Sequence, residues 1–267
     1  MKFAALATLV ISFVPGLVSA QEEILVGGAA AMVPFMQELA TAHQVKHPTD
    51  RFQFVTESLG STGGIKATEA GRIAIGLTAR PLHPGESKKL VYRLVGRTPL
   101  IVGVHRDVTV NSLTESQICD IYAGKVRSWK EVGGDQSQIV VLTRNEDGTK
   151  ETFRASIKCF KNLKEGPDAI IMPTVDGMSD ALIRRHATIG LTDLAVLLQA
   201  QRGFKALAIE GQSPTVDTMR SGKYRWVKEF GVVTAGAPQG AVKRFLDFAL
   251  GPEGEPILAR HGVLVVR

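Results

Sequence analysis

Cysteine and long apolar runs are both scarce in this sequence of 267 residues. The two cysteines, Cys119 and Cys159, lie far from the apolar N-terminal stretch, so none stands there to carry a lipid. No later segment approaches the roughly 20 apolar residues that cross a bilayer. We therefore expect neither a lipid anchor nor a membrane span in the mature chain.

Clustered positive charge is missing as well. The sequence holds 32 Lys and Arg against 26 Asp and Glu, a net charge of +6, and its basic residues are scattered among acids. Nucleic-acid-binding proteins instead carry a dense basic stripe interleaved with aromatics. The balance suits an anionic ligand, and we expect no nucleic-acid partner.

The usual catalytic and cofactor motifs are also lacking. The glycine-rich segment 60–66 does not have the spacing of a P-loop, and no GxSxG elbow occurs. His43 and His47 are four residues apart on a predicted helix, but no third metal ligand is evident, which favours packing over metal binding. Neither cysteine lies in a catalytic motif. We expect no enzyme activity, no cofactor and no metal.

The first 20 residues have the order of a secretory signal peptide. A lysine precedes the apolar run FAALATLVISFV, and the small residues Val18, Ser19 and Ala20 follow it. We expect cleavage after Ala20 and a free protein in the periplasm. About 247 residues then remain, more than one typical domain of roughly 100–200 residues, so two lobes or one large α/β unit are expected.

Export to an oxidising compartment leaves two possibilities for Cys119 and Cys159. They can form a disulfide if their Cα atoms come within about 4.4–6.8 Å of each other. The alternative is two separate buried thiols, and both possibilities remain open at this point.

Strand and helix patterns alternate along the first third of the chain. Buried strands are predicted at 24–28, 52–57 and 72–78, with helices beginning at Pro34 and after the turn 59–64. This alternation predicts an open parallel sheet, whose ligands lie beyond the carboxyl ends of its strands.

The second part of the chain repeats the pattern. Further strands are predicted at 90–95, 99–105 and 139–143. A helix within 112–124 can be capped by Ser112 or Thr114. The remaining predicted helices cover 150–160 and the C-terminal stretch 240–262, which returns to the first lobe.

The turns between strands and helices suit a small oxyanion. A helix N-terminus presents unpaired N–H groups and the positive end of the peptide dipole. In the turn 60–64, the glycines permit close approach of a ligand, and Ser61 and Thr62 add hydroxyl donors. The alternative is that this segment is only a turn.

Two arginines that follow predicted strands are candidates for charge recognition. Arg80 comes after the strand 72–78, and Arg144 comes after the strand 139–143. A guanidinium can bind two oxygens of a tetrahedral anion. The alternative is a surface arginine paired with an acid such as Asp147.

The ordered motifs of the chain resemble the phosphate-type substrate-binding proteins of ABC importers, in the periplasmic-binding-protein superfamily. The likeness covers nearly the whole chain after residue 20, and its most specific segment is DIYAGKVRSWKEVGG. The other matching segments are, in order, GGAAAMVPFM, SLGSTGGIKA, AIGLTARPL, GRTPLIVGVHRD, VVLTRNEDGTKETF, ATIGLTDL, PTVDTMRSGKY and FLDFALGPEGEPILARHGVL.

This resemblance implies a type II periplasmic-binding-protein fold of two α/β lobes. Two hinge strands would cross between the lobes, near 98–105 and 224–233, and hinge closure would clamp the ligand. The implied segments are a signal peptide at 1–20, a first lobe at 21–102, a second lobe at 103–228 and a C-terminal return to the first lobe at 229–267.

The resemblance also implies ligand-binding residues on the first two turns. Backbone N–H groups of Ala31 and Met32 would serve on the first turn, where many relatives have a hydroxyl residue in place of Ala31. Ser61, with Thr62 and Gly63 beside it, matches the family's ligand-binding serine on the second turn.

A third set of ligand residues follows Arg144, which matches the family's ligand-binding arginine. Gly148 and Thr149 match the end of the same turn, which is one residue shorter here. Asp147 stands where the family has serine. An acid is unfavourable there beside a dianion unless it points away or accepts the ligand's proton.

The remaining turn departs most from the family. Phosphate-specific members have an aspartate there, which accepts the ligand's proton and rejects sulfate. This chain has Ala79 followed by Arg80, which resembles a Ser-Arg pair in another branch of the family. Rejecting sulfate therefore needs another acceptor, and Asp147 is the only candidate.

We therefore expect a monomer that captures inorganic phosphate and delivers it to ABC permease subunits in the membrane. One alternative is the same fold binding sulfate or another oxyanion, and another is a ligand sensor not coupled to transport. A phosphate-ester hydrolase is disfavoured because neither metal ligands nor an activated nucleophile is visible.

Overall fold

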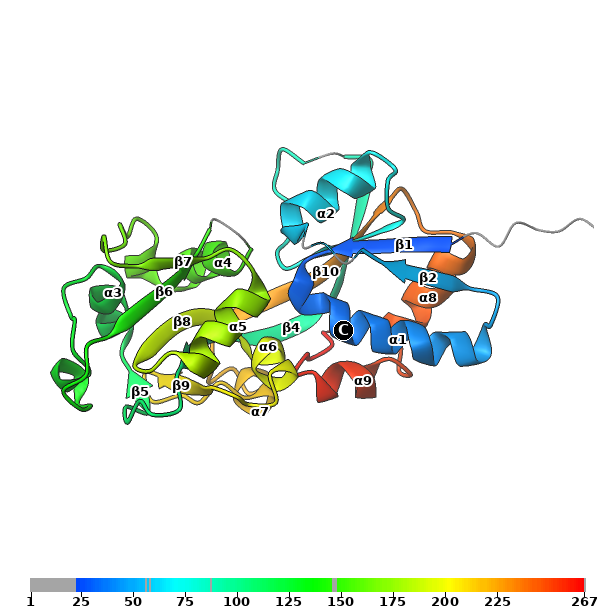
Figure 1. Cartoon of the computed structure of the whole chain (residues 1–267). Helices are drawn as coiled ribbons and strands as arrows, with labels where there is room; N and C mark the ends of the chain where they lie inside the picture. Colours follow the sequence, from blue (N-terminus) through cyan, green and yellow to red (C-terminus); the bar gives the residue numbers. More distant parts are fainter. Residues whose placement is uncertain (1–22, 56, 58, 87, 146–147, 267) are drawn as a thin grey trace, which may run out of the picture.

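Two lobes lie side by side in the computed structural model, and strands β4 and β10 run between them (Figure 1). The structure describes residues 23–55, 57, 59–86, 88–145 and 148–266. The predicted signal peptide at 1–20 and the candidate acceptor Asp147 lie outside these residues. None of the described helices is long and apolar enough to span a membrane.

The first lobe is built on the strand order β2-β1-β3-β10-β4. Strand β1 pairs in parallel with β2 and β3, whereas β10 runs antiparallel to β3 and β4. Its strands are β1 (Glu23–Gly28), β2 (Arg51–Phe54), β3 (Ile75–Thr78), β4 (Leu90–Val104) and β10 (Val227–Ala235). Its helices are η1 (Ala30–Met32), α1 (Val33–Lys46), α2 (Gly60–Glu69), α8 (Gly240–Leu250) and α9 (Glu255–Arg260).

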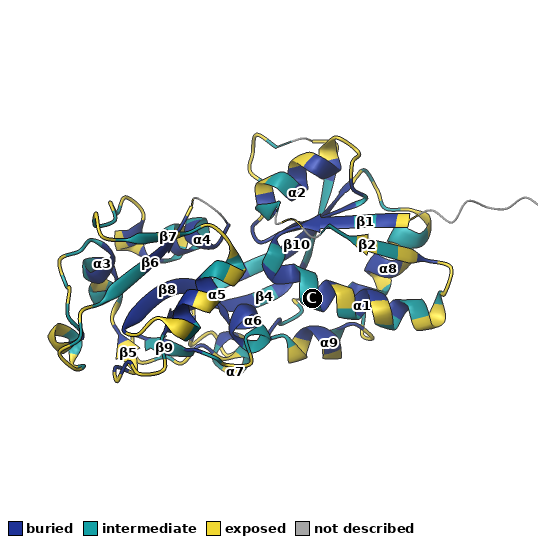
Figure 2. Ribbon diagram, in the orientation of Figure 1, coloured by how far each residue is buried: buried dark blue, intermediate teal, exposed yellow. Residues whose placement is uncertain are grey.

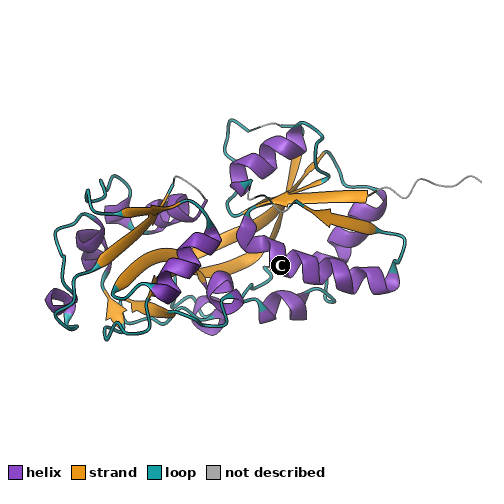
Figure 3. Ribbon diagram, viewed as in Figure 1, coloured by secondary structure: helices purple, strands orange, loops and turns teal. Residues whose placement is uncertain are grey.

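The second lobe continues from the same long strand. Beyond Pro99, β4 pairs antiparallel with β8 and β9, and β6 pairs in parallel with β8 and β7. Its other strands are β5 (Ser112–Leu113), β6 (Val140–Arg144), β7 (Ile170–Met172), β8 (Thr188–Asp193) and β9 (Lys205–Ile209). Its helices are α3 (Glu115–Tyr122), η2 (Trp129–Val132), α4 (Gly148–Ser156), η3 (Lys158–Phe160), α5 (Val175–Arg184), α6 (Leu194–Gln199) and α7 (Val216–Arg220). Helices flank the strands of both lobes (Figure 3).

The structure confirms the two-lobed α/β architecture, and nearly every segment predicted as a strand or a helix has the predicted conformation. One prediction was wrong: the segments 90–95 and 99–105 form the single strand β4, because the chain stays paired to β10 through a register shift at Phe230 and Gly231. Helix α4 begins at Gly148, earlier than the predicted 150. The lobe boundaries at 102 and 228 stay a prediction.

Apolar side chains form two large buried clusters. One joins side chains of the first lobe to those of α5 and α6, and the other lies among α3, η2, η3 and strands of the second lobe. Buried residues lie along the strands of both lobes (Figure 2). Cys119 on α3 and Cys159 on η3 form a disulfide with a Cα separation of 6.3 Å, so the possibility of two separate thiols is wrong. Thr114, rather than Ser112, caps α3 by accepting a hydrogen bond from the Gln117 N–H.

The two histidines considered as metal ligands are packing residues. His43 is buried, and its Nε2 lies 2.9 Å from Asp50 Oδ2. Its ring stacks on that of His47 with a centroid separation of 4.5 Å. Two aromatic rings of α8 also surround His43, which explains its position on the core face of α1.

Candidate functional site

Several of the predicted turns converge on one cavity of about 200 Å³ between the lobes. The first lobe contributes the turn before η1 and the start of α2, and the second lobe contributes the start of α4. Six predicted ligand residues line the cavity, namely Ala31, Ser61, Ala79, Arg144, Gly148 and Thr149. The N-terminal N–H groups and dipoles of α2 and α4 give this space a positive potential.

Ser61 is fixed by its neighbour on the adjoining strand. Its Oγ accepts a hydrogen bond of 2.9 Å from the Ala79 N–H, and the side chain is buried. A hydroxyl that accepts this bond keeps its own hydrogen for another acceptor. Ser61 is therefore held as a hydrogen-bond donor at the cavity.

The two lobes approach each other closely at Gly148. A Cβ atom placed on this residue would lie 3.1 Å from Ser61 Oγ and 3.2 Å from the Ala79 carbonyl oxygen. Gln199 on α6 makes a second contact between the lobes, because its Nε2 donates to the Ala31 carbonyl at 2.9 Å. These contacts bring the donors of both lobes to the same cavity.

The backbone of Arg144 is fixed by a network of polar side chains in the second lobe. The Arg144 carbonyl accepts a hydrogen bond of 3.0 Å from Lys150 Nζ, and Lys150 forms an ion pair of 3.0 Å with Glu165. Arg144 and Lys150 are both buried. The end of β6 is thereby fixed where the arginine lines the cavity.

Sequence reasoning missed a buried lysine that lines the same cavity. Lys228 Nζ on β10 donates to Thr149 Oγ1 at 2.8 Å and to Asp193 Oδ2 at 2.7 Å. The side chains of Lys228 and Asp193 are 2% and 1% exposed. The available signal was a lysine at an inward position of the strand, two residues before the buried Phe230.

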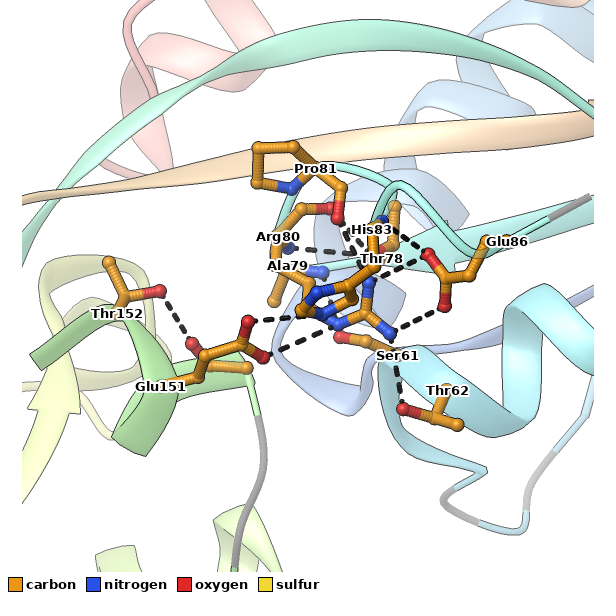
Figure 4. Close-up of polar contacts among 11 residues, drawn as sticks. Ser61, Thr62, Thr78, Ala79, Arg80, Pro81, His83, Glu86, Glu151 and Thr152 are labelled. Carbon is orange, nitrogen blue, oxygen red and sulfur yellow. Dashed lines mark hydrogen bonds and ion pairs between the residues drawn. The ribbon is translucent and has the colours of Figure 1, made fainter. Parts of the chain in front are cut away.

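Arg80 lies in an adjoining cavity of about 290 Å³ and is already bonded to protein groups. Its two terminal nitrogens bind the two carboxylate oxygens of Glu86 at 3.0 and 2.8 Å, and Thr62 Oγ1 accepts from it at 3.2 Å (Figure 4). This guanidinium, opposed by burial, lowers the pKa of the Glu86 carboxyl. Arg80 as a ligand residue stays a prediction.

Glu151 on α4 faces two basic side chains of the first lobe. Its carboxylate lies 3.0 Å from His83 Nε2 and 3.5 Å from Arg80 Nε (Figure 4). All three residues line the adjoining cavity. Glu151 therefore ties the start of α4 to the turn that follows β3.

Two further predicted residues lie outside the lining of both cavities. The Met32 N–H donates to the Ala29 carbonyl at 3.0 Å, so an anion could only share this hydrogen. The Met32 side chain is fully buried. Gly63 lies within the first turn of α2 but does not line either cavity. Their roles, like that of Asp147, stay predictions.

Among the described residues that line the 200 Å³ cavity, Arg144 and Lys228 are cationic and none is acidic. The hydroxyls of Ser61 and Thr149, together with Asn145 and the starts of two helices, complete its polar surface. Larger hollows exist, such as a groove of about 490 Å³ beside α6 and β9, but mainly apolar side chains line that groove. A two-lobed fold with such a cavity has the charge and size that suit a small anion.

Comparison with known proteins gives the family. The PBP superfamily domain matches residues 16–253, so the chain belongs to the PBP superfamily. It is 24% identical over 234 residues to the phosphate-binding protein PstS of Bacillus subtilis, covering 86% of this chain and 75% of that protein. It is 21% identical to PstS of Borreliella burgdorferi, covering 91% and 90%.

A solved structure agrees with this assignment. A phosphate ABC transporter substrate-binding protein from Clostridium perfringens, determined with bound phosphate, superposes with a TM-score of 0.84 at 25% identity. The superposition covers 92% of this chain and all of that chain. The periplasmic-binding-protein family predicted from the sequence motifs is therefore confirmed.

Proposed function

We propose that this protein captures inorganic phosphate between its two lobes and delivers it to an ABC importer. The observation that carries the proposal is the convergence of Ser61, Arg144, Gly148 and Thr149, from both lobes, on one cavity. Relatives and a similar solved structure are named as phosphate-binding proteins. The role is binding rather than catalysis, and the location is the periplasm after removal of residues 1–20.

The proposed ligand contacts combine charge with directed donors. Arg144 supplies a positive charge, Lys228 supplies an ammonium group whose charge is partly offset by Asp193, and Ser61 and Thr149 supply hydroxyls. The first-turn N–H groups of α4 and α2 point at the same space, where a helix dipole favours negative charge. Charge-assisted hydrogen bonds of this kind are about twice as strong as neutral ones.

Binding is proposed to act by population shift between open and closed lobes. An open form can use the donors of only one lobe, whereas the closed form uses both, so the anion favours closure. The contacts of Glu151 with Arg80 and His83, and of Gln199 with Ala31, favour the same closed arrangement. Closure would present the surface that permease subunits recognise, with one protein molecule acting as a monomer.

A second candidate ligand is sulfate. Among the described lining residues of the cavity no carboxylate is present to accept a phosphate proton, and a site without a charged acceptor does not strongly reject a fully ionised anion. Phosphate selectivity would then depend on Asp147, which has the only proposed acceptor role.

Isothermal titration of phosphate and then sulfate tests the proposal, with protein unfolded and refolded beforehand to remove carried-over ligand. Tight phosphate binding with sulfate excluded supports the proposal and calls for an acceptor such as Asp147. Equal binding of both anions would mean that the protein binds oxyanions in general rather than phosphate in particular. Absence of binding to either anion contradicts the proposed function.

A further inference from the structure

A group of three potential metal ligands lies in the second lobe, outside both cavities described above. Asp107 Oδ1 is 2.6 Å from His105 Nδ1, and Asp107 Oδ2 is 2.5 Å from His186 Nδ1. The three ligand atoms all lie within 4.8 Å of one another, and the two imidazole rings are 4.7 Å apart. Three side chains thus place two imidazole nitrogens and one carboxylate next to one another.

The sheet brings these residues together. Strand β4 ends beside the beginning of antiparallel β8, with Val104 opposite Ile189, so the residues after β4 meet those before β8 (Figure 1). The His105 N–H donates to the Thr188 carbonyl at 3.3 Å. This pairing sets the His105 backbone against the turn that carries His186.

The turn at His186 is held in a specific conformation by the core. Ala187 has a left-handed backbone with φ of 56°, which costs free energy for a residue with a Cβ atom. Its carbonyl accepts hydrogen bonds of 3.0 Å from both Trp129 Nε1 and the Val140 N–H. Its own N–H donates to Asp107 Oδ1 at 3.4 Å. Buried partners thereby keep His186 next to Asp107.

We infer that His105, Asp107 and His186 bind a divalent transition metal of the zinc type. Two neutral imidazoles and one carboxylate are a donor set that Zn²⁺ accepts, with ligand distances of about 2.0–2.2 Å. Hard cations such as Mg²⁺ and Ca²⁺ prefer oxygen ligands and are not matched by two imidazoles. Water molecules would complete the coordination.

The site has the exposure that metal entry requires. The side chain of His186 is 81% exposed, that of Asp107 is 39% exposed and that of His105 is 13% exposed. Two ligands of a tetrahedral ion at these metal–ligand distances lie roughly 3.3–3.5 Å apart, so each imidazole nitrogen must separate by roughly 0.8 Å from its present carboxylate partner. The exposed His186 side chain can make this movement, while His105 supplies a fixed ligand.

No metal site is predicted from the sequence, because the ligands come from distant parts of the chain. His186 and Asp107 are 79 residues apart, so no ligand spacing is visible in the sequence. None of the three residues lines the proposed anion cavity, and the inference does not rest on the proposed function. A bound ion would link the end of β4 to the turn before β8 and stabilise the second lobe.

Titration of ZnCl2 into the protein, prepared without a histidine tag, tests the site. We expect one Zn²⁺ per chain and a Zn²⁺-dependent rise in the melting temperature. His186→Gln and Asp107→Asn should weaken binding at least tenfold, and Co²⁺ bound to the wild type should show a visible absorption band that both variants lose. His47→Gln, which changes a histidine outside the site, should bind like the wild type.

The exposed position of His186 makes His186→Gln a variant that keeps its fold, and its circular dichroism and metal-free melting temperature check this. The inference is wrong if the wild type shows no saturable Zn²⁺ binding. It is also wrong if both variants bind Zn²⁺ as the wild type does, because the ion would then lie elsewhere.

Discussion

Lys228 on β10 and Asp193 at the end of β8 form a buried ion pair at the base of the anion cavity, with Nζ 2.7 Å from Oδ2. Lys228 also holds the hydroxyl of Thr149, at the start of α4. Strand β10, which runs between the lobes, therefore places the Lys228 ammonium next to the donors that the second lobe presents at the cavity. Asp193 also caps α6, because its Oδ1 accepts a hydrogen bond from the Val196 N–H.

Lys228→Met is expected to lower the free energy of unfolding by about 3–5 kcal/mol, since it leaves a buried carboxylate without its partner. Adding Asp193→Asn removes that charge and can keep the cap on α6, so the double variant should regain much of the stability. Both variants should bind phosphate more weakly than the wild type. Chemical denaturation and titration measure the two effects separately, and a double variant no more stable than Lys228→Met would contradict this pairing.

Arg144→Ala is expected to weaken phosphate binding by about 1.5–3 kcal/mol, the range for a hydrogen bond to a charged group. This corresponds to a rise in Kd of roughly 10- to 150-fold. Arg220→Ala is the matched control, because Arg220 is 60% exposed on α7 and pairs with Asp217. If isothermal titration gives the same Kd for Arg144→Ala and the control, Arg144 does not bind the ligand.

Gly148→Ala is expected to weaken phosphate binding, through its effect on lobe closure, without lowering the melting temperature. Alanine favours a helix over glycine by about 1 kcal/mol, but the new Cβ would lie 3.1 Å from Ser61 Oγ in the other lobe. Overpacking of this kind costs about 1–3 kcal/mol, so phosphate affinity should fall while the melting temperature is maintained. Gly85→Ala is the control, because its Cβ would meet nothing within 4 Å. Unchanged affinity would show that the lobes do not close at Gly148.

Removing the disulfide with Cys119→Ser and Cys159→Ser is expected to lower the free energy of unfolding by about 2–4 kcal/mol. The bridge joins residues 40 positions apart, which restricts the unfolded chain. Neither cysteine lines the anion cavity, so the Kd for phosphate should change little. Urea denaturation in oxidising and in reducing buffer compares the free energies of unfolding with and without the disulfide. Equal values in the two buffers would contradict the prediction.

The Asp50 carboxyl should make the free energy of unfolding depend on pH in the acid range. Burial by itself raises the pKa of its carboxyl, but hydrogen bonds from Arg244 and His43 outweigh burial and lower it. A lowered pKa in the folded state stabilises the protein above the unfolded value of about 3.9, and this contribution is lost as the pH falls through the folded value. The stability advantage of wild type over Asp50→Asn should therefore shrink below about pH 4. Thermal unfolding across the acid range measures it, and a constant difference would exclude Asp50 as the cause.

Local patterns in the sequence predicted most of the elements around the site. Buried apolar runs predicted β1, β3 and β6, and the glycines and hydroxyls after them predicted where helices begin. The length of β4 could not be predicted in this way. Its continuity depends on pairing with β10, which is more than 120 residues later in the chain, and nothing local to Gly96 records that partner.

The sequence by itself determined the alternation of strands and helices, the family motifs and the turns that line the cavity, because short-range periodicity and turn chemistry act within a few residues. Tertiary structure alone decided which distant groups meet. It placed Lys228 beneath Thr149, brought Glu151 to Arg80, and joined Cys119 to Cys159. The physical reason is that burial and charge pairing depend on neighbours in space, and strand pairing across the fold sets those neighbours.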